Sequence, residues 1–281
     1  MRAHDPLITA AELQTQISAA NVRVLDATWV PTFLKDRPNG YTYYLGGHLP
    51  GAVFFDIDEI ADQSSDLPHM LPPEDAFAEA VGQLGVSNQD EIIVYDSNGF
   101  FASARAWWMF RVMGHEHVRV LDGGLKAWQD HGGDLEASQQ TPAPANFTAK
   151  LNRALLKDMN EMRAHILARD IAILDARAQG RFDGSSPEPR PELPSGHMPG
   201  SSCMPATDLI SSDGTLKAPA DLATMLAQYA ETDVVTTCGS GVSAAIISLA
   251  LARLGNWNAA LYDGSWSEWA AHSDNSIATI S

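Results

Sequence analysis

The amino-acid sequence contains an internal repeat, which constrains the fold more than any other feature. VRVLDATW returns as IAILDARA, and GHLPGA at Gly47 returns as GHMPGS at Gly196, both with an offset of 149 residues. VLDGGLKAW, which ends at Trp128, returns as LYDGSWSEW, which ends at Trp269, with an offset of 141. Three matches in the same order predict two homologous domains.

A stretch rich in Pro and Ala, EASQQTPAPANFTAKLN, separates the two copies and follows neither a helical nor a strand period. It is expected to be a linker, with the boundary near Ala143. We therefore predict an N-terminal domain over residues 1–142 and a C-terminal domain over residues 143–281. Two domains of about 100–150 residues account for the full length.

Each copy alternates short apolar strands with helices. In the second copy the predicted strands are AILDAR, DVVTT and AALYDG, and the predicted helices are ADLATMLAQYA and SAAIISLALARL. The last helix is expected to end at Gly255, with Arg253 in its final turn. Strands separated by helices predict a mostly parallel sheet with helices on both faces. The expected fold class is therefore α/β, with two tandem domains of this kind.

The balance of charge excludes several classes of partner. The chain has 18 basic and 35 acidic residues, a formal net charge of −17. Such a surface repels nucleic acid and anionic membranes, so neither is expected to bind. No segment approaches the roughly 20 consecutive apolar residues of a membrane span. An anionic substrate would have to be met by a local group of arginines.

The cysteines and the N-terminus indicate a reduced, cytoplasmic protein. Two cysteines are too few for a disulfide framework, and no Cys/His spacing suggests zinc, so neither a metal nor another cofactor is expected. MRAHDPLITAAELQTQI has no apolar stretch of signal-peptide length, and its segment from Thr9 to Glu12 is typical of a helix start. In such a compartment a thiol stays a thiol.

Cys238 stands where the strand VVTT passes through CGSG into an apolar helix. Ligands of open α/β sheets bind beyond the carboxyl ends of the strands. A helix N-terminus offers unpaired N–H groups and the positive end of its dipole, which favour a thiolate. Gly239 and Gly241 allow the loop amides to curl into a nest for negative charge. The alternative is a buried cysteine that only fills the strand end. Cys203 is expected to be a packed strand residue.

These motifs resemble those of a known family. The tandem copies, the two GHxPG turns, LDGGLKAW and CGSGVSA are similar to the rhodanese superfamily of sulfurtransferases, and within it to the members that use 3-mercaptopyruvate, over essentially the whole chain. Thiosulfate-using members typically carry CRKGV, whereas Gly239 and Ser240 stand here in place of the two basic residues. Phosphatase relatives need an arginine six residues after the cysteine, where this chain has Ala244. Phosphate chemistry is therefore not expected.

The second copy is predicted to be the active one. In the first copy the corresponding loop lies in VYDSNGFFASARAWWMF, with Asp96 near the position of the nucleophile. An aspartate cannot become a persulfide, so the N-terminal domain is expected to be catalytically inactive. The family has the same asymmetry.

The resemblance also implies the remaining site residues. Arg181 and Arg190 match the family's substrate-binding arginines, and planar guanidinium groups suit a carboxylate. Asp58 and His69 align with an Asp and a His that form a Ser–His–Asp group with the loop serine, here Ser240, in a site between the domains. The role of Arg177 stays open, and His48 and His197, which occur in both copies, are expected to be structural. The loop residues expected to contact the transferred sulfur are Gly239, Gly241, Val242 and Ser243.

The implied activity is transfer of sulfur from 3-mercaptopyruvate through a Cys238 persulfide, with release of pyruvate. The expected acceptor is a small thiol, cyanide or a thioredoxin-like dithiol protein. Two alternatives stay open. One is a thiosulfate:cyanide sulfurtransferase on the same fold, and the other is a non-catalytic sulfur carrier or binding module.

Overall fold

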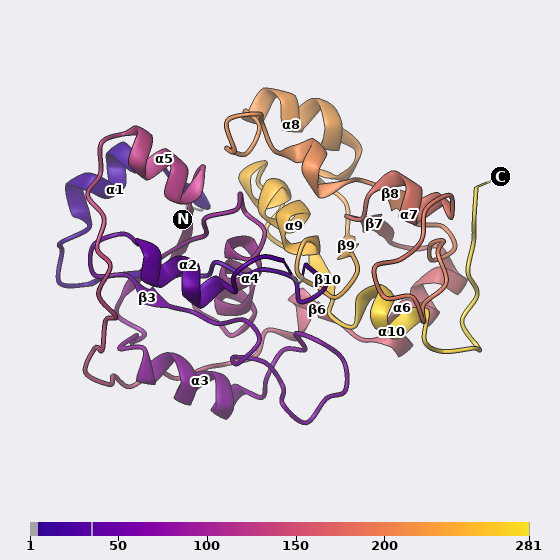
Figure 1. The fold of residues 1–281 in the computed structure, drawn as a ribbon. Helices are drawn as coiled ribbons and strands as arrows, with labels where there is room; N and C mark the ends of the chain where they lie inside the picture. The colour runs from indigo at the N-terminus through magenta and orange to yellow at the C-terminus, as the bar shows by residue number, and fades with distance from the viewer. Residues whose placement is uncertain (1–4, 35, 281) are drawn as a thin grey trace. The chain divides into compact units, whose positions relative to one another are not determined.

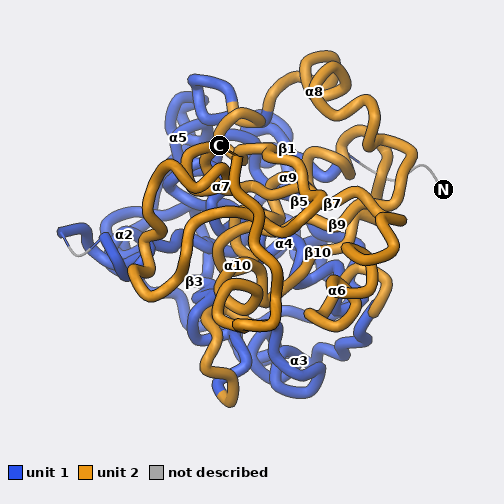
Figure 2. Tube along the Cα trace, turned by 90° about the vertical axis from the view of Figure 1, so that its right-hand side faces the viewer, with its two compact units in different colours: residues 1–63, 71–152, 211–216 blue, residues 64–70, 153–210, 217–281 orange. Residues whose placement is uncertain are grey.

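The computed structural model describes residues 5–34 and 36–280, which form two α/β units of similar construction (Figure 1). The units, coloured separately in Figure 2, exchange two short segments. The first unit includes residues up to 63, residues 71–152 and residues 211–216, and the second includes residues 64–70, 153–210 and those from 217 onward. The boundary near residue 143 stays a prediction.

The first unit is built on a parallel sheet in the order β1-β5-β4-β2-β3. The central strands β2 and β4 pair from Val22 with Glu91 to Asp26 with Tyr95. The strands are β1 (Leu7–Ile8), β2 (Val22–Asp26), β3 (Val53–Phe54), β4 (Glu91–Tyr95) and β5 (Val118–Leu121), and every pair is parallel.

The second unit repeats this arrangement, with the order β6-β10-β9-β7-β8. Its strands are β6 (Leu156–Lys157), β7 (Ala172–Asp175), β8 (Ser202–Cys203), β9 (Val234–Thr237) and β10 (Ala260–Tyr262), again all parallel. The predicted α/β fold class with mostly parallel sheets is confirmed. The pairs of named strands are parallel, and the isolated bridges of His48 with Glu136 and His197 with Ala278 are antiparallel.

Helices cover both faces of the first sheet. Leu13 and Trp128, from α1 and α5, pack with Val24, Ile93 and Leu121 on one face, while α4 contacts β4 and β5 from the other. Phe77 of α3 and Phe110 of α4 meet edge to face, with ring centroids 5.3 Å apart. The helices are α1 (Ala10–Gln16), α2 (Gly40–Gly46), α3 (Glu74–Gln83), α4 (Ser103–Val112) and α5 (Gly124–Asp130).

The second sheet is covered in the same way. Met162 of α6 and Trp266 of α10 pack with Ile173, Val235 and Tyr262 on one face, and α9 contacts β9 and β10 from the other. The helices are α6 (Met159–Ala168), α7 (Gln179–Asp183), α8 (Pro219–Leu226), α9 (Ala244–Arg253) and α10 (Ser265–Trp269), with 3-10 turns at Arg153–Leu155, Ala206–Leu209 and Ala227–Tyr229.

The helix ends predicted from the sequence are confirmed. Thr9 caps α1 with its hydroxyl, which accepts from the Glu12 N–H at 3.2 Å, and the Glu12 carboxylate accepts from the Thr9 N–H at 2.9 Å. Helix α9 ends at Arg253, and Gly255 follows with φ of +99°, a conformation that favours glycine. The first four residues of the segment inspected for a leader lie outside the described residues. None of the helices in the described part is long and apolar enough to cross a membrane.

Candidate active site

Cys238 lies at the carboxyl end of β9, between β9 and α9, and is 2 % exposed. Gly241 takes a left-handed conformation with φ of +75°, which turns the loop before α9 begins. Within the described residues, the backbone N–H groups of Gly239, Ser240, Val242 and Ser243 make no hydrogen bond. The loop therefore surrounds the cysteine with donors that are available to an anion.

The start of α10 holds the other side of this loop. The Cys238 carbonyl accepts from the Trp266 N–H at 3.0 Å, and the Gly239 carbonyl accepts from the N–H of Ser267 at 2.8 Å and from its hydroxyl at 2.6 Å. The Cys238 N–H donates to Ser265 Oγ at 3.2 Å. Both carbonyl oxygens are thus occupied by donors of Trp266 and Ser267. Within the described residues, the N–H groups of residues 239, 240, 242 and 243 are left for a ligand.

The first unit contains an equivalent loop, and that loop binds an anion. Asp96 follows β4 as Cys238 follows β9, and its carbonyl accepts from the Leu125 N–H at 3.0 Å, as that of Cys238 accepts from Trp266. The Asp96 carboxylate is buried, and its burial raises its pKa, while backbone N–H bonds act in the opposite direction. Its Oδ1 accepts from the N–H groups of Asn98 and Phe100, and its Oδ2 accepts from those of Ala102 and Ser103, at 2.9–3.3 Å. The loop of the first unit is thus an anion nest that the chain fills with its own side chain.

Arg181 lies beside the Cys238 loop. A Cβ placed on Gly239 would lie only 3.1 Å from Arg181 Nη2, so this glycine leaves room for the guanidinium. Arg181 Nε and Nη2 both donate to the Glu188 carboxylate, with the Nη2 contact at 2.6 Å. The arginine is therefore held in place by Glu188, whose side chain is only 2 % exposed.

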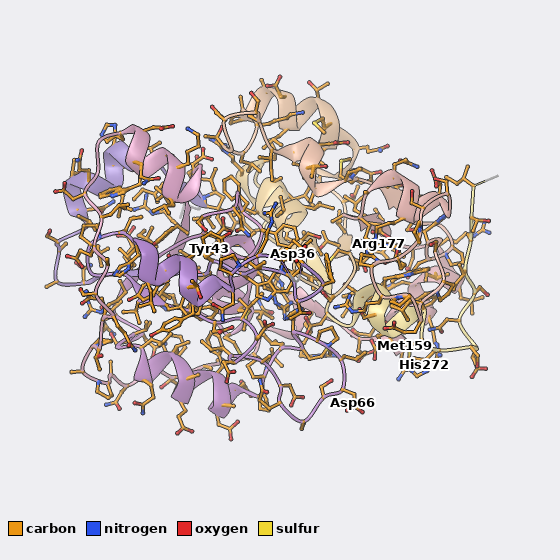
Figure 3. The ribbon with its side chains drawn as sticks, viewed as in Figure 1. Asp36, Tyr43, Asp66, Met159, Arg177 and His272 are labelled. Carbon is orange, nitrogen blue, oxygen red and sulfur yellow. The ribbon has the colours of Figure 1, made fainter. Side chains whose placement is uncertain are left out.

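Glu188 also binds Arg177, a buried residue that follows β7 in the second unit. Arg177 is labelled in Figure 3. Arg177 Nη1 donates to Glu188 at 2.7 Å, Nη2 donates to Asp175 at 2.6 Å, and the guanidinium stacks over the Trp266 ring at 4.2 Å. Burial lowers the pKa of Arg177, but the two carboxylates more than offset it, so that the net shift is upward. These contacts give Arg177 a structural role. Two guanidinium groups and two carboxylates make this cluster neutral.

Arg190 lies outside the neutral cluster. It is half-buried, and within the described residues its guanidinium makes no ion pair or hydrogen bond. Two arginines were predicted to bind substrate. The charge of Arg181 is neutralised by the Glu188 carboxylate, whereas Arg190 has no such ion pair within the described residues. Arg190 therefore has an unmatched positive charge to offer to an anion.

The three residues of the predicted Ser–His–Asp group lie in different parts of the fold. Ser240 is in the Cys238 loop and is 9 % exposed. His69 belongs to the segment 64–70, which is part of the second unit although it comes from the first copy of the repeat. Asp58 belongs to the first unit, where its Oδ2 accepts from Trp29 Nε1 at 2.8 Å. His69 thus shares a unit with Ser240 and Cys238, and the grouping with Asp58 stays a prediction.

The remaining cysteine and the repeated histidines are structural. Cys203 ends the edge strand β8, as expected, with its Sγ 3.6 Å from the Arg177 carbonyl, and burial raises its pKa to about 11. His48 and His197 each bond through Nδ1 to a carbonyl at 2.8 Å and stack on a ring, those of Tyr44 and Phe182. No group of three or more His, Cys, Asp or Glu side chains in the described residues is arranged to hold a metal ion.

Comparison with known proteins gives the family. Two segments, residues 9–131 and 158–272, match the model of the rhodanese-like domain. The chain belongs to the rhodanese-like family.

Similar rhodanese-like proteins have names of two kinds. Thiosulfate/3-mercaptopyruvate sulfurtransferase 2 of Arabidopsis thaliana is 39 % identical over 95 % of this chain and 84 % of that protein. Thiosulfate sulfurtransferase of Bos taurus is 40 % identical over 94 % of this chain and 91 % of that protein. The crystal structure of SseA from Escherichia coli, described among 3-mercaptopyruvate sulfotransferases, has a TM-score of 0.85 at 36 % identity and covers 94 % of this chain and 99 % of its own.

Sequence reasoning missed three residues that shape this rhodanese-like site. Glu188 stands in the run PEPR, of which only the arginine was predicted to bind substrate. Ser265 and Ser267 lie in the third repeated motif, LYDGSWSEW, where the first copy has Gly124 and Lys126. The replacement of that glycine by a serine was the signal available in the sequence.

Proposed function

We propose that this chain transfers sulfur from 3-mercaptopyruvate to an acceptor through a persulfide on Cys238. The observation that carries the proposal is the Cys238 loop, whose N–H groups at residues 239, 240, 242 and 243 have no partner within the described residues. The same loop in the first unit binds a carboxylate, that of Asp96, through four N–H groups. A loop built in this way stabilises negative charge on the cysteine sulfur and on a second sulfur bound to it.

The arginines bind the 2-oxo acid in this proposal. Mercaptopyruvate carries a carboxylate, and a planar guanidinium binds it through two parallel hydrogen bonds. Arg190 supplies the unmatched positive charge. Arg181, held beside Gly239 by Glu188, supplies N–H donors at the loop itself. The two arginines therefore have different tasks, since the charge of Arg181 is already neutralised.

The chemical step is nucleophilic attack by the Cys238 thiolate on the thiol sulfur of the substrate. The new S–S bond forms as the C–S bond breaks, and the electron pair of that bond leaves with the carbon as the enolate of pyruvate. Protonation of the enolate gives pyruvate. Donors near the substrate carbonyl stabilise the enolate oxygen as its charge develops.

The Ser240 hydroxyl is proposed as one of these donors. We include His69 as the group that polarises Ser240 and Asp58 as the group that orients His69, by the logic of a Ser–His–Asp arrangement. The inclusion of segment 64–70 in the second unit supports the part assigned to His69. Gly239, Gly241, Val242 and Ser243 complete the loop around the persulfide.

The second half-reaction returns the enzyme to its thiolate state. The outer sulfur of the persulfide is attacked by a small thiol, by cyanide or by one thiol of a thioredoxin-like protein. The S–S bond breaks, the acceptor carries the sulfur away and the electron pair returns to Cys238. A cytoplasmic location is part of the proposal, and the two free cysteines are consistent with a reducing compartment.

The loop favours mercaptopyruvate over thiosulfate. Relatives named for each donor are similarly close in identity, so overall similarity does not choose between the donors. Thiosulfate is a dianion, and the loop places neutral Gly239 and Ser240 next to the cysteine. A single unmatched guanidinium suits the single carboxylate of a 2-oxo acid better than the dianion.

The proposal is tested by comparing donors on the purified full chain. Pyruvate is followed from 3-mercaptopyruvate, thiocyanate is followed from thiosulfate and cyanide, and the intact mass is read after each donor without acceptor. We expect a gain of one sulfur atom, faster with mercaptopyruvate, that is absent in Cys238→Ser. Arg190→Ala should raise the KM for mercaptopyruvate by about 10- to 100-fold, as loss of a charge-assisted pair of about 1.5–3 kcal/mol implies.

Three outcomes would contradict it. Pyruvate release that survives in Cys238→Ser would exclude the persulfide route. Faster turnover of thiosulfate would favour the thiosulfate:cyanide sulfurtransferase. A chain that gains no sulfur from either donor would be a carrier or binding module. Arg169→Ala is a suitable control for Arg190→Ala, because Arg169 is an exposed arginine at the end of α6 in the same unit.

A further inference from the structure

Ser265 has an unusual backbone conformation for a residue with a side chain. It is fully buried and has φ of +50°, in the left-handed region that normally favours glycine. The corresponding position of the first unit is indeed a glycine, Gly124, with φ of +57°. A strained residue of this kind persists where the surrounding structure holds it, and such residues cluster at functional sites.

The two units share the left-handed backbone conformation at this position, but only the second unit has a serine there. In both, the next residue donates its N–H to the loop carbonyl at 3.0 Å, Leu125 to Asp96 and Trp266 to Cys238. A Cβ on Gly124 would lie 2.2 Å from the Asp96 carbonyl oxygen, so the first unit has no room for a serine. The unit that carries the cysteine has a serine there in spite of the strain.

The Ser265 hydroxyl uses all of its hydrogen-bonding capacity. It donates to the Tyr262 carbonyl at 2.8 Å, and it accepts from the Cys238 N–H at 3.2 Å and from the Thr237 hydroxyl at 3.3 Å. A hydroxyl has one donor and two acceptor sites, so its orientation is fixed by these three partners. It therefore holds the peptide group that leads into Cys238.

Both peptide groups of Cys238 are fixed as a result. Its N–H is held by Ser265 and its C=O by Trp266, and the Gly239 carbonyl is held by Ser267. The sulfur can then move only by rotation of its own side chain. Without the hydroxyl, the Cys238 N–H loses its acceptor, while the carbonyl of the same peptide, that of Thr237, still accepts from the Ala176 N–H at 2.8 Å. The position of the sulfur relative to the N–H groups of the loop is then less firmly fixed.

We infer that Ser265 is a positioning residue for Cys238. Its backbone takes the left-handed conformation, and from there its hydroxyl holds the Cys238 N–H. The effect on catalysis rests on the proposed function, whereas the hydrogen bonds of Ser265 do not depend on it. A misplacement of about 1 Å in a reacting group is enough to lower a rate by about 100-fold. The residue acts through Cys238 and does not itself react.

Three variants of the full chain test the inference. Ser265→Ala removes the hydroxyl and keeps the strain, whereas Ser265→Gly removes the hydroxyl and relieves the strain. Ser248→Ala is the matched control, because Ser248 is also buried in this unit and bonds to Thr236 Oγ1 at 3.0 Å, away from the loop. Each protein is measured for its melting temperature, for kcat and KM with 3-mercaptopyruvate, and for the rate at which iodoacetamide alkylates Cys238 at neutral pH.

We expect kcat to fall by at least about tenfold in both Ser265 variants, with KM changed less than about threefold, because the arginines are untouched. The alkylation rate should fall with kcat. Ser265→Gly should melt at a higher temperature than Ser265→Ala, and Ser248→Ala should lose stability without losing kcat.

The inference is overturned if Ser265→Gly keeps the kcat and alkylation rate of the original chain, or if the losses simply follow melting temperature across the three variants. Alkylation needs no sulfur donor. A chain that transfers no sulfur would therefore refute the proposed function, while the alkylation rates would still decide the role of Ser265.

Discussion

At the scale of single residues, positions 96 and 238 occupy the same place in the two units and differ in what they carry. Both follow a central strand, and both have a carbonyl that accepts an N–H at 3.0 Å from the helix that closes the site. Asp96 brings its own negative charge to the loop, whereas beside Cys238 the N–H groups of residues 239, 240, 242 and 243 have no partner within the described part of the chain. Under the proposed function, this difference confines the chemistry to one unit.

The Asp96 carboxylate should be important for the stability of the first unit. Asp96→Asn leaves one oxygen for four N–H donors, so that two buried donors lose their acceptor, at about 1–3 kcal/mol each. Removal of the buried charge is by itself stabilising, because burial disfavours the charged carboxylate and raises the pKa of Asp96. This gain does not compensate for the loss of two acceptors. Urea unfolding should show a loss of about 2 kcal/mol or more. An unchanged midpoint would mean that the nest does not need its anion.

At the scale of elements, helix α6 shows how a short sequence signal fixes an element on the sheet. Asp158 Oδ1 accepts from the Glu161 N–H at 3.0 Å, and the Glu161 carboxylate accepts from the Asp158 N–H at 3.0 Å. This capping box fixes the start of α6 at Met159. From there Met162 reaches the core between α6 and the sheet.

The contribution of this cap should depend on pH. The bond from the Glu161 N–H is the main reason that the pKa of Asp158 lies below its usual 3.8. A lowered pKa means that the stabilisation is present above the unfolded value and is lost as pH falls through the folded value. Asp158→Ala should therefore cost about 1 kcal/mol at neutral pH and much less at a pH well below 3.8, where the carboxyl is protonated in the folded chain as well. Urea unfolding at the two pH values measures this, and an equal loss at both would show that the charge of the cap is not involved.

At the scale of the whole molecule, the repeat and the alternation of strands and helices were sufficient to predict the fold, because both depend on local pattern. The Cys238 loop could be placed for the same reason, since a strand end and a helix start are local signals. Ser265 left a signal in the replacement of Gly124 by a serine, but its bonding partners could not be predicted. Glu188 could not be recognised at all, because its role depends on partners in three dimensions. The exchange of segments 64–70 and 211–216 between the units likewise has no signal in composition or period.

This exchange predicts how a separated half should behave. A fragment of residues 143–281 lacks segment 64–70, and its segment 211–216 has lost the unit in which it packs. Leu216, which is 3 % exposed in the full chain and donates its N–H to Asp122 at 2.8 Å, would be uncovered at a cost of about 1.5–3 kcal/mol. The fragment should melt below the full chain in calorimetry. If it melts at the same temperature, the exchanged segments do not contribute to stability.

The filled loop of the first unit also has a meaning for the descent of a duplicated gene. A redundant copy of an active site is free to lose its nucleophile, but here most replacements would leave four backbone N–H groups without a hydrogen-bond acceptor. Aspartate keeps those amides bonded, and under the proposed function it also removes the reactivity, so that the copy can persist as a scaffold without a substrate. On that proposal, natural selection at position 96 acts on folding, while at position 238 it acts on chemistry.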